Sequence, residues 1–84
     1  KTMTKKLILN LRIMARNENH DIEVSDEITA HELVYGLNEA YNLGIDTNDI
    51  AQSFLRTENP ITLLRGDKKL HEFGLHNGTI INVI

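Results

Sequence analysis

The sequence predicts an α+β roll in which an antiparallel-rich sheet of four to five strands is covered on one face by one long helix. Three observations predict this: an alternating apolar segment near the start, a helix-start signal before an amphipathic segment, and short strand-like segments separated by turn residues. A hairpin, then one helix, then further short strands suits a sheet with a helix on one face. With 84 residues, we expect a single domain over residues 1–84.

The first strand is expected at residues 6–13, where apolar and polar side chains alternate, so that one face is buried. Its apolar positions are Leu7, Leu9, Leu11 and Ile13. A polar turn over 15–19 leads to a second alternating segment over 20–24, with Ile22 and Val24 inward, and the two strands should form a hairpin. Because Met3 fits a native start, residues 1–4 are expected to be disordered or to come from an expression vector.

A helix is expected over residues 30–43. Thr29 and Glu32 fit a capping box, in which each side chain bonds the backbone N–H of the other, and Ile28 and Leu33 fit the hydrophobic staple beside it. Gly44 fits the left-handed position that ends such a helix. The helical period places one apolar arc against the core, and its members are Ala30, Leu33, Val34, Leu37, Ala40 and Tyr41.

Three short strands are expected after the helix. Residues 46–51 form a polar connection with room for one helical turn, and the strands follow over 53–57, 61–64 and 79–84. Pairs of turn-forming residues separate them, namely Asn59-Pro60, Gly66-Asp67 and Asn77-Gly78.

Composition argues against several classes of partner and location. Lys and Arg number 9 against 12 Asp and Glu, and the net charge of −3 gives no general attraction to nucleic acid or anionic membranes. The chain has no Cys, so disulfides and thiolate sites are excluded. No apolar run approaches the roughly 20 residues that span a bilayer, and residues at the start of the sequence lack the apolar core and small-residue cleavage site of a signal peptide. We therefore expect no nucleic-acid partner, no direct membrane insertion and a cytoplasmic location.

Neither catalysis nor a bound cofactor is expected. The four histidines lack the spacing and partner ligands of a zinc site, and these are His20, His31, His71 and His76. The only serines, Ser25 and Ser53, lie in no Gly-rich elbow, and no phosphate loop or carboxylate pair is present. We therefore expect that the chain is not an enzyme and that it binds no metal or cofactor.

The closing segment carries a family resemblance. Its pattern is Gly66-x-x-Lys69-Leu70-x-x-x-Gly74-Leu75-x-Asn77-Gly78, followed by Ile81-x-Val83-Ile84. With the order of elements, this pattern resembles the ubiquitin-like β-grasp roll over nearly the whole chain. Within that superfamily it is similar to the YukD/EsaB group, small ubiquitin-like proteins encoded with the type VII secretion systems of Gram-positive bacteria. The resemblance implies that the first and last strands lie parallel at the centre of the sheet.

The resemblance also implies a function. The chain is expected to be a non-conjugated accessory or regulatory protein of a type VII (ESX-like) secretion system that docks noncovalently onto protein components of that machine. The sequence ends at Val83-Ile84 without a Gly-Gly tail, so modifier or sulfur-carrier roles are not expected unless the native chain continues further. Two alternatives stay open: the cytosolic ubiquitin-like domain of a larger membrane component, and an auxiliary subunit of an oxygenase or other enzyme complex. The oligomeric state is left open.

The outer face of the sheet, opposite the helix, is the candidate partner-binding surface, because ubiquitin uses the corresponding face. Strand alternation turns Ile8 and Arg12 outward, and it does the same for Phe54 and Arg56 if their neighbours point inward. The family resemblance places Ile81 and Val83 inside, which leaves Ile80 and Asn82 outside. The hypothesis is one apolar patch rimmed by polar groups, formed by Ile8, Phe54 and Ile80 and by Arg12, Arg56 and Asn82.

Two readings compete with this surface. Scattered exposed apolar residues are normal on any protein, and a one-residue register slip would turn the patch inward.

A second candidate is Tyr35, which lies opposite the buried arc of the helix near Glu39. Its competing interpretation is an ordinary solvated helix face.

Overall fold

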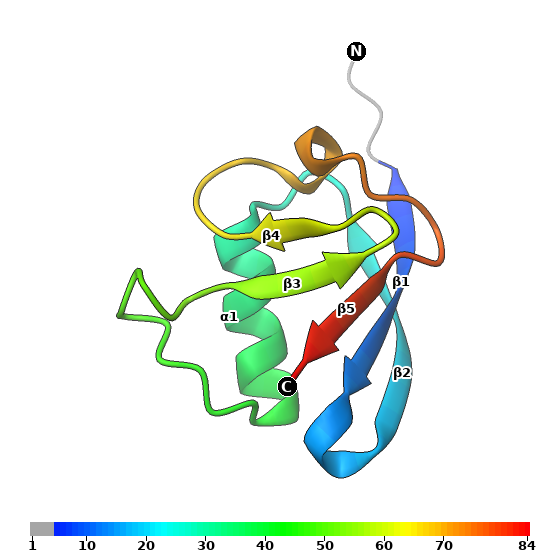
Figure 1. Ribbon diagram of the computed structural model, residues 1–84. Helices are drawn as coiled ribbons and strands as arrows, with labels where there is room; N and C mark the ends of the chain where they lie inside the picture. Colours follow the sequence, from blue (N-terminus) through cyan, green and yellow to red (C-terminus); the bar gives the residue numbers. More distant parts are fainter. Residues whose placement is uncertain (1–4) are drawn as a thin grey trace.

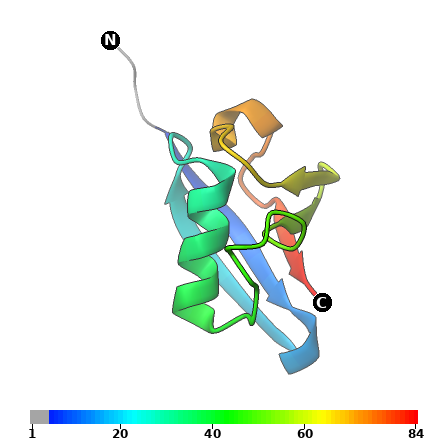
Figure 2. The same ribbon diagram turned by 90° about the vertical axis from the view of Figure 1, so that its left-hand side faces the viewer.

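A computed structural model describes residues 5–84, so the expectation for residues 1–4 lies outside the described residues (Figure 1). The elements are β1 (Lys6–Ile13), η1 (Met14–Arg16), β2 (Glu18–Ser25), α1 (Ala30–Tyr41), β3 (Leu55–Glu58), β4 (Thr62–Leu64), η2 (Leu70–Phe73) and β5 (Ile80–Val83), where η marks a 3-10 turn. The five strands form one sheet in the order β2-β1-β5-β3-β4, and α1 crosses one face of it (Figures 1 and 2). The predicted α+β fold is confirmed.

The two central strands come from opposite ends of the described chain. β1 pairs antiparallel with β2 and parallel with β5, with Asn10 opposite Ile80. β3 pairs antiparallel with both β5 and β4. The parallel central pair that the family resemblance implied is therefore present.

The core lies between α1 and the inner face of the sheet. The inward positions predicted for the first strand are confirmed, since Leu9 and Leu11 are 0% exposed and Ile13 is 2% exposed, with Leu7 half-buried at the strand start. The inner residues of β3 and β5 are buried as well, and they are Leu55, Thr57, Ile81 and Val83. Ala30, Leu33, Val34 and Leu37 of α1 complete the core.

The predicted helical arc is wrong at one position. Ala40 is exposed, whereas Tyr41 is half-buried against the core. Ala40 lies at the margin of the arc, and its single methyl group is too short to reach the sheet from there. The longer tyrosine side chain bridges that distance.

Both ends of α1 are closed by side chains. The predicted capping box is present: Thr29 Oγ1 accepts from the Glu32 amide at 3.1 Å, and Glu32 Oε1 accepts from the Thr29 amide at 2.8 Å. Gly44 is left-handed as predicted, with φ of 75°, but the helix ends earlier than expected and its left-handed cap is Asn42. Arg16 satisfies the last carbonyls, donating from Nη1 to Tyr41 O at 2.6 Å and from Nη2 to Asn42 O. This contact joins the β1–β2 turn to the end of the helix.

Removing the N-cap hydroxyl should weaken the fold measurably. Thr29→Ala is expected to lower the free energy of unfolding by about 1 kcal/mol, because the Glu32 amide loses its acceptor. Urea denaturation followed by circular dichroism measures the loss. Thr29→Ser keeps the hydroxyl and should stay close to wild type, so an equal loss in both variants would contradict the capping role.

Several element boundaries differ from those predicted. β2 begins at Glu18 and not at residue 20, because the single turn of η1, closed by left-handed Asn17, lets pairing start with Ile13 opposite Glu18. Residues 46–51 form turns without a helical segment. The three later strands are shorter than expected, and η2 was not predicted at all.

The closing motif has a physical explanation. Leu70 is fully buried, and Gly74 ends η2 in a left-handed conformation with φ of 74°. Asn77 Oδ1 accepts from the Ile8 amide at 2.9 Å, and the Gly78 amide donates to Ile8 O at 2.8 Å. These bonds extend the pairing of β1 with the chain before β5. The Asn-Gly pair therefore aligns the last strand at the sheet centre.

Candidate functional site

Three of the predicted surface residues form one row across the outer face. In the register, Asn82 of β5 lies opposite Arg12 on one side and opposite Arg56 on the other. Glu58 binds two of these side chains: its Oε2 lies 3.8 Å from Arg12 Nη1 and accepts a hydrogen bond from Asn82 Nδ2. This row, Arg12-Asn82-Arg56, is the polar ridge of the outer face.

The three predicted apolar members do not form one patch. Ile80 lies between Asn10 and Glu58 on one side of the polar ridge, and Ile8, 47% exposed, lies one step further along β1 in the same direction. Phe54 lies on the other side of the ridge. β3 runs antiparallel to β5, so the step from Arg56 back to Phe54 leads away from Ile80 and toward Ile84.

Apolar side chains instead gather at the C-terminal end of β5. A hollow of about 560 Å³ opens there over β3 and β4, and we call it the sheet hollow. Its apolar members are Met14, Ile61, Leu63 and Ile84, which are 57%, 90%, 37% and 88% exposed. The predicted partner-binding residues included none of these four. Ile61 and Leu63 could have been predicted, because they alternate along the chain with the inward residues Thr62 and Leu64.

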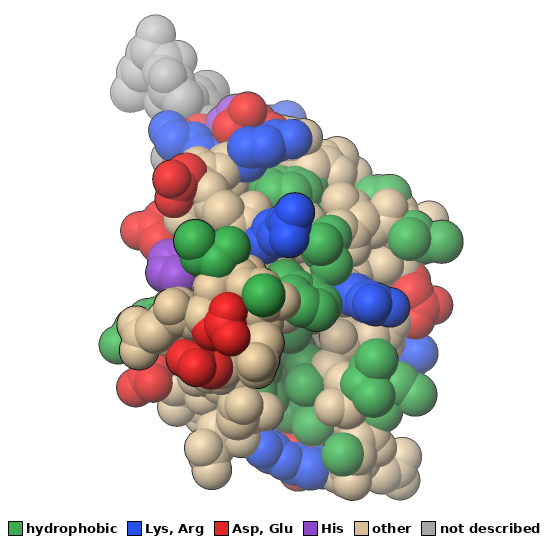
Figure 3. Space-filling model, turned by 60° about the vertical axis from the view of Figure 1, so that its left-hand side comes forward, with side chains coloured by type: hydrophobic (Ala, Val, Ile, Leu, Met, Phe, Trp, Pro, Cys, Tyr) green, Lys and Arg blue, Asp and Glu red, His purple; other side chains and the backbone are tan. Residues whose placement is uncertain are grey.

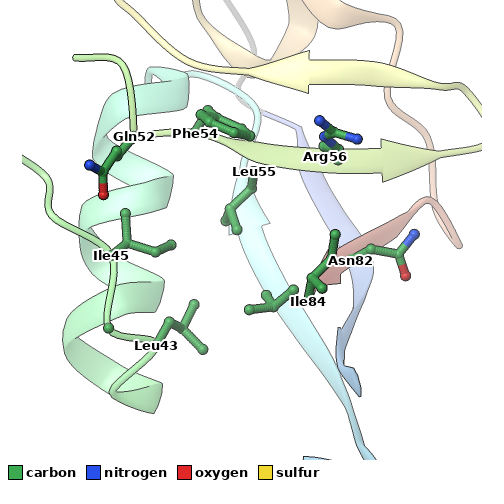
Figure 4. Close-up of a pocket in the computed structure, with 10 residues that line it drawn as sticks. Leu43, Ile45, Gln52, Phe54, Leu55, Arg56, Asn82 and Ile84 are labelled. Atoms are coloured by element: carbon green, nitrogen blue, oxygen red, sulfur yellow. The ribbon is translucent and has the colours of Figure 1, made fainter. Parts of the chain in front are cut away.

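A second hollow, of about 310 Å³, lies where the helix layer meets the sheet, and we call it the seam hollow. Figure 4 shows Leu43 and Ile45 from the connection after α1 pointing toward Leu55 and Ile84, with Phe54 at the border. Viewed from this side, hydrophobic side chains gather along the middle of the surface with basic side chains among them (Figure 3).

Arg56, Asn82 and Ile84 line both hollows, so they form the wall between them. Arg56 is exposed, and its guanidinium carbon lies 6.0 Å from the centre of the Phe54 ring. No carboxylate lies within ion-pair distance of Arg56 among residues 5–84. The arrangement can therefore offer a partner one cation, the mainly apolar sheet hollow, and the seam hollow, which Gln52 lines together with apolar side chains.

Three other features considered in the sequence are the exposure of Tyr35, clusters of metal ligands and membrane-spanning helices. Tyr35 is 51% exposed on the outward side of α1. In the part of the chain that the structure describes, no three His, Asp or Glu side chains come together as metal ligands. None of the helices within residues 5–84 has the length and apolar character needed to cross a membrane.

Comparison with known proteins identifies a family. A family model described as "WXG100 protein secretion system (Wss), protein YukD" matches residues 8–83. No curated protein matches the sequence significantly.

Solved structures show the same fold at low sequence identity. The C-terminal ubiquitin-like domain of mouse tubulin-specific chaperone e superposes with a TM-score of 0.73 at 15% identity, over 99% of this chain and 89% of that one. A designed protein based on ubiquitin gives 0.62 at 19%, over 92% and 84% of the two chains. The ubiquitin-like domain of Plasmodium falciparum Dsk2 gives 0.59 at 13%, over 95% and 97%. These likenesses establish the ubiquitin-like β-grasp.

Proposed function

Because the chain belongs to the YukD family of the WXG100 protein secretion system, we propose that it serves this system as a non-conjugated docking module. It holds another protein component of the machinery by noncovalent contacts in the cytoplasm and performs no catalysis itself. One observation carries the proposal: exposed Met14, Ile61 and Ile84 surround a hollow at one end of the outer face. Contiguous exposed apolar surface is typical of a site where another protein binds.

The chemistry of this surface supports a protein partner. Apolar side chains surrounded by polar groups, with arginine among them, are characteristic of protein interfaces. Phe54 at the border of the seam hollow and Arg56 on the wall are of the types that most often dominate binding energy. The docking surface in this proposal comprises the two hollows and the polar ridge, and thus includes Arg12 and Asn82. Ile8 and Ile80 lie beyond the ridge and contribute at most at the edge.

The test compares charge insertion into the sheet hollow with the same change elsewhere. Ile61→Asp combined with Ile84→Asp changes two side chains that are 90% and 88% exposed, so the fold should be retained. Ile50→Asp is the matched control, because Ile50 is 85% exposed and lines neither hollow. Each variant replaces the native protein in cells that carry the secretion system, and affinity capture with quantitative mass spectrometry identifies what it binds.

Wild type and Ile50→Asp are expected to recover secretion-system subunits. The double variant is expected to recover about 30-fold less of them, or none. Circular dichroism confirms that all three proteins are folded. Equal recovery by all three would place the docking site elsewhere, with the Tyr35 side of α1 as the next surface to test. Recovery of unrelated enzymes without any secretion-system subunit would overturn the proposed function.

A further inference from the structure

The wall between the two hollows carries an unpaired positive charge. Arg12 and Asn82 both bind Glu58, and the Glu58 carboxylate is therefore already paired. Arg56 has no carboxylate partner among residues 5–84. Its neighbour across the strands, Asn82, has a buried Oδ1 that accepts no hydrogen bond, so Arg56 does not donate there either. The guanidinium carbon lies 6.0 Å from the centre of the Phe54 ring, at the outer limit of a cation–π contact.

A partner that covers this wall must satisfy the guanidinium. Arginine presents a planar set of N–H donors that matches a carboxylate in two parallel hydrogen bonds. Covering Arg56 without supplying an acceptor would remove its water and leave a charge unpaired, which is strongly unfavourable. An apolar partner alone therefore does not fit this surface.

The hollows on either side define the rest of the partner. Met14, Ile61 and Leu63 surround the sheet hollow, and Leu43, Ile45 and Phe54 surround the seam hollow. A segment that crosses the wall places apolar side chains into both hollows. Since the whole chain has a net charge of −3, general attraction does not recruit an acidic segment, and recognition depends on contact with Arg56 itself.

We infer that the partner presents an acidic amphipathic segment, in which an Asp or Glu that pairs with Arg56 is flanked on both sides by large apolar side chains. This inference rests on the proposed function and names the chemistry of the component that the docking surface holds. The carboxylate gives orientation and specificity, and the apolar side chains give most of the affinity.

A displayed library of random peptides is the probe. Peptides are selected on the wild-type protein and on Arg56→Glu, with Arg65→Glu as the matched control because Arg65 is exposed and lines neither hollow. Wild type is expected to enrich peptides with an acidic residue between large apolar ones. Arg56→Glu should lower the affinity for these peptides by about 30-fold or more. Selection on this variant should enrich peptides with Lys or Arg in place of the acidic residue. Arg65→Glu should leave their affinity unchanged.

Three results would overturn the inference: enriched peptides without an acidic residue, an equal loss of affinity in both arginine variants, or no enriched peptide at all. If one of these occurs while the Ile61 and Ile84 double variant still loses the secretion-system subunits, the proposed function stands and the inference about partner chemistry fails. If the acidic peptides need Arg56 but the subunits bind the double variant normally, the subunits dock on another surface and the inference about their chemistry fails. If wild type recovers no secretion-system subunit, the proposed function itself fails.

Discussion

Leu11→Ala is expected to lower the free energy of unfolding by about 3 to 4 kcal/mol, the largest single effect that we predict. Leu11 is 0% exposed on central β1, opposite His20 of β2 and Ile81 of β5. Hydrogen-bonded strands on both sides prevent the backbone from closing the cavity that the lost methyl groups leave. A domain of this size has a total stability on the order of 5–10 kcal/mol, so urea denaturation should show a large shift of the midpoint.

Ile8→Ala on the same strand is the control. Ile8 is 47% exposed on the outer face, so its truncation should cost less than about 1 kcal/mol. The pair also tests the register of β1, since residues 8 and 11 point to opposite faces. Comparable losses in the two variants would mean that this assignment of faces is incorrect.

Thr79→Val is expected to lower the free energy of unfolding by about 2 kcal/mol. Thr79, directly before β5, is 0% exposed, and its Oγ1 donates to Asn59 O at 3.0 Å and accepts from the His76 amide at 3.1 Å. Valine preserves the shape of the side chain but removes both hydrogen bonds. It therefore leaves a carbonyl and an amide without their partner, and that desolvation penalty causes the loss.

Two measurements identify the cause of this loss. Thr79→Ser keeps the hydroxyl, so it should retain the slow hydrogen exchange of the His76 amide, whereas Thr79→Val should lose this protection. Unchanged exchange in the valine variant would contradict the role of the hydroxyl. Because Thr79 lines neither hollow, the valine variant should still bind its partner once folded.

The proposed docking surface differs from the patch that strand alternation and the family resemblance predicted, and the difference changes which residues should be tested. The expected patch joined Ile8, Phe54 and Ile80 across three strands. In the structure the polar ridge separates Phe54 from the other two, and the outward residue that follows Asn82 on the Phe54 side is Ile84. Interface energy concentrates in small clusters of neighbouring residues, so the position of the cluster matters more than the number of apolar residues on the face.

Most of the fold could be predicted because its signals are local. The alternation of residues 6–13 predicts a strand with one buried face, and the Thr29 and Glu32 pair predicts where the helix begins. Asn77-Gly78 predicts the turn before the last strand. Each of these signals depends on neighbours in the sequence, so the sequence carries them without reference to the rest of the chain.

Boundaries depended on interactions between distant segments. Gly44 was the better local candidate for the residue after the helix, yet α1 ends at Tyr41 with Asn42 as its cap, and Arg16 from the β1–β2 turn binds the last carbonyls there. A contact between residues so far apart in sequence leaves no local signal. The early start of β2 has a local cause instead, because the short turn closed by left-handed Asn17 lets Glu18 pair with Ile13.

The candidate site was decided in the same way. Alternation assigns a side chain to a face, since it depends only on position along one strand. It turned Arg12 outward, and Arg56 once its neighbours were taken as inward, whereas the outward assignment of Asn82 came from the family resemblance. Which outward side chains become neighbours depends on strand order, direction and register, which only the folded sheet sets. The sheet hollow therefore combines Met14, Ile61 and Ile84, which are remote from one another in the chain. Cross-strand pairing likewise brings Glu58 to Arg12 and Asn82, and Arg56 is left unpaired.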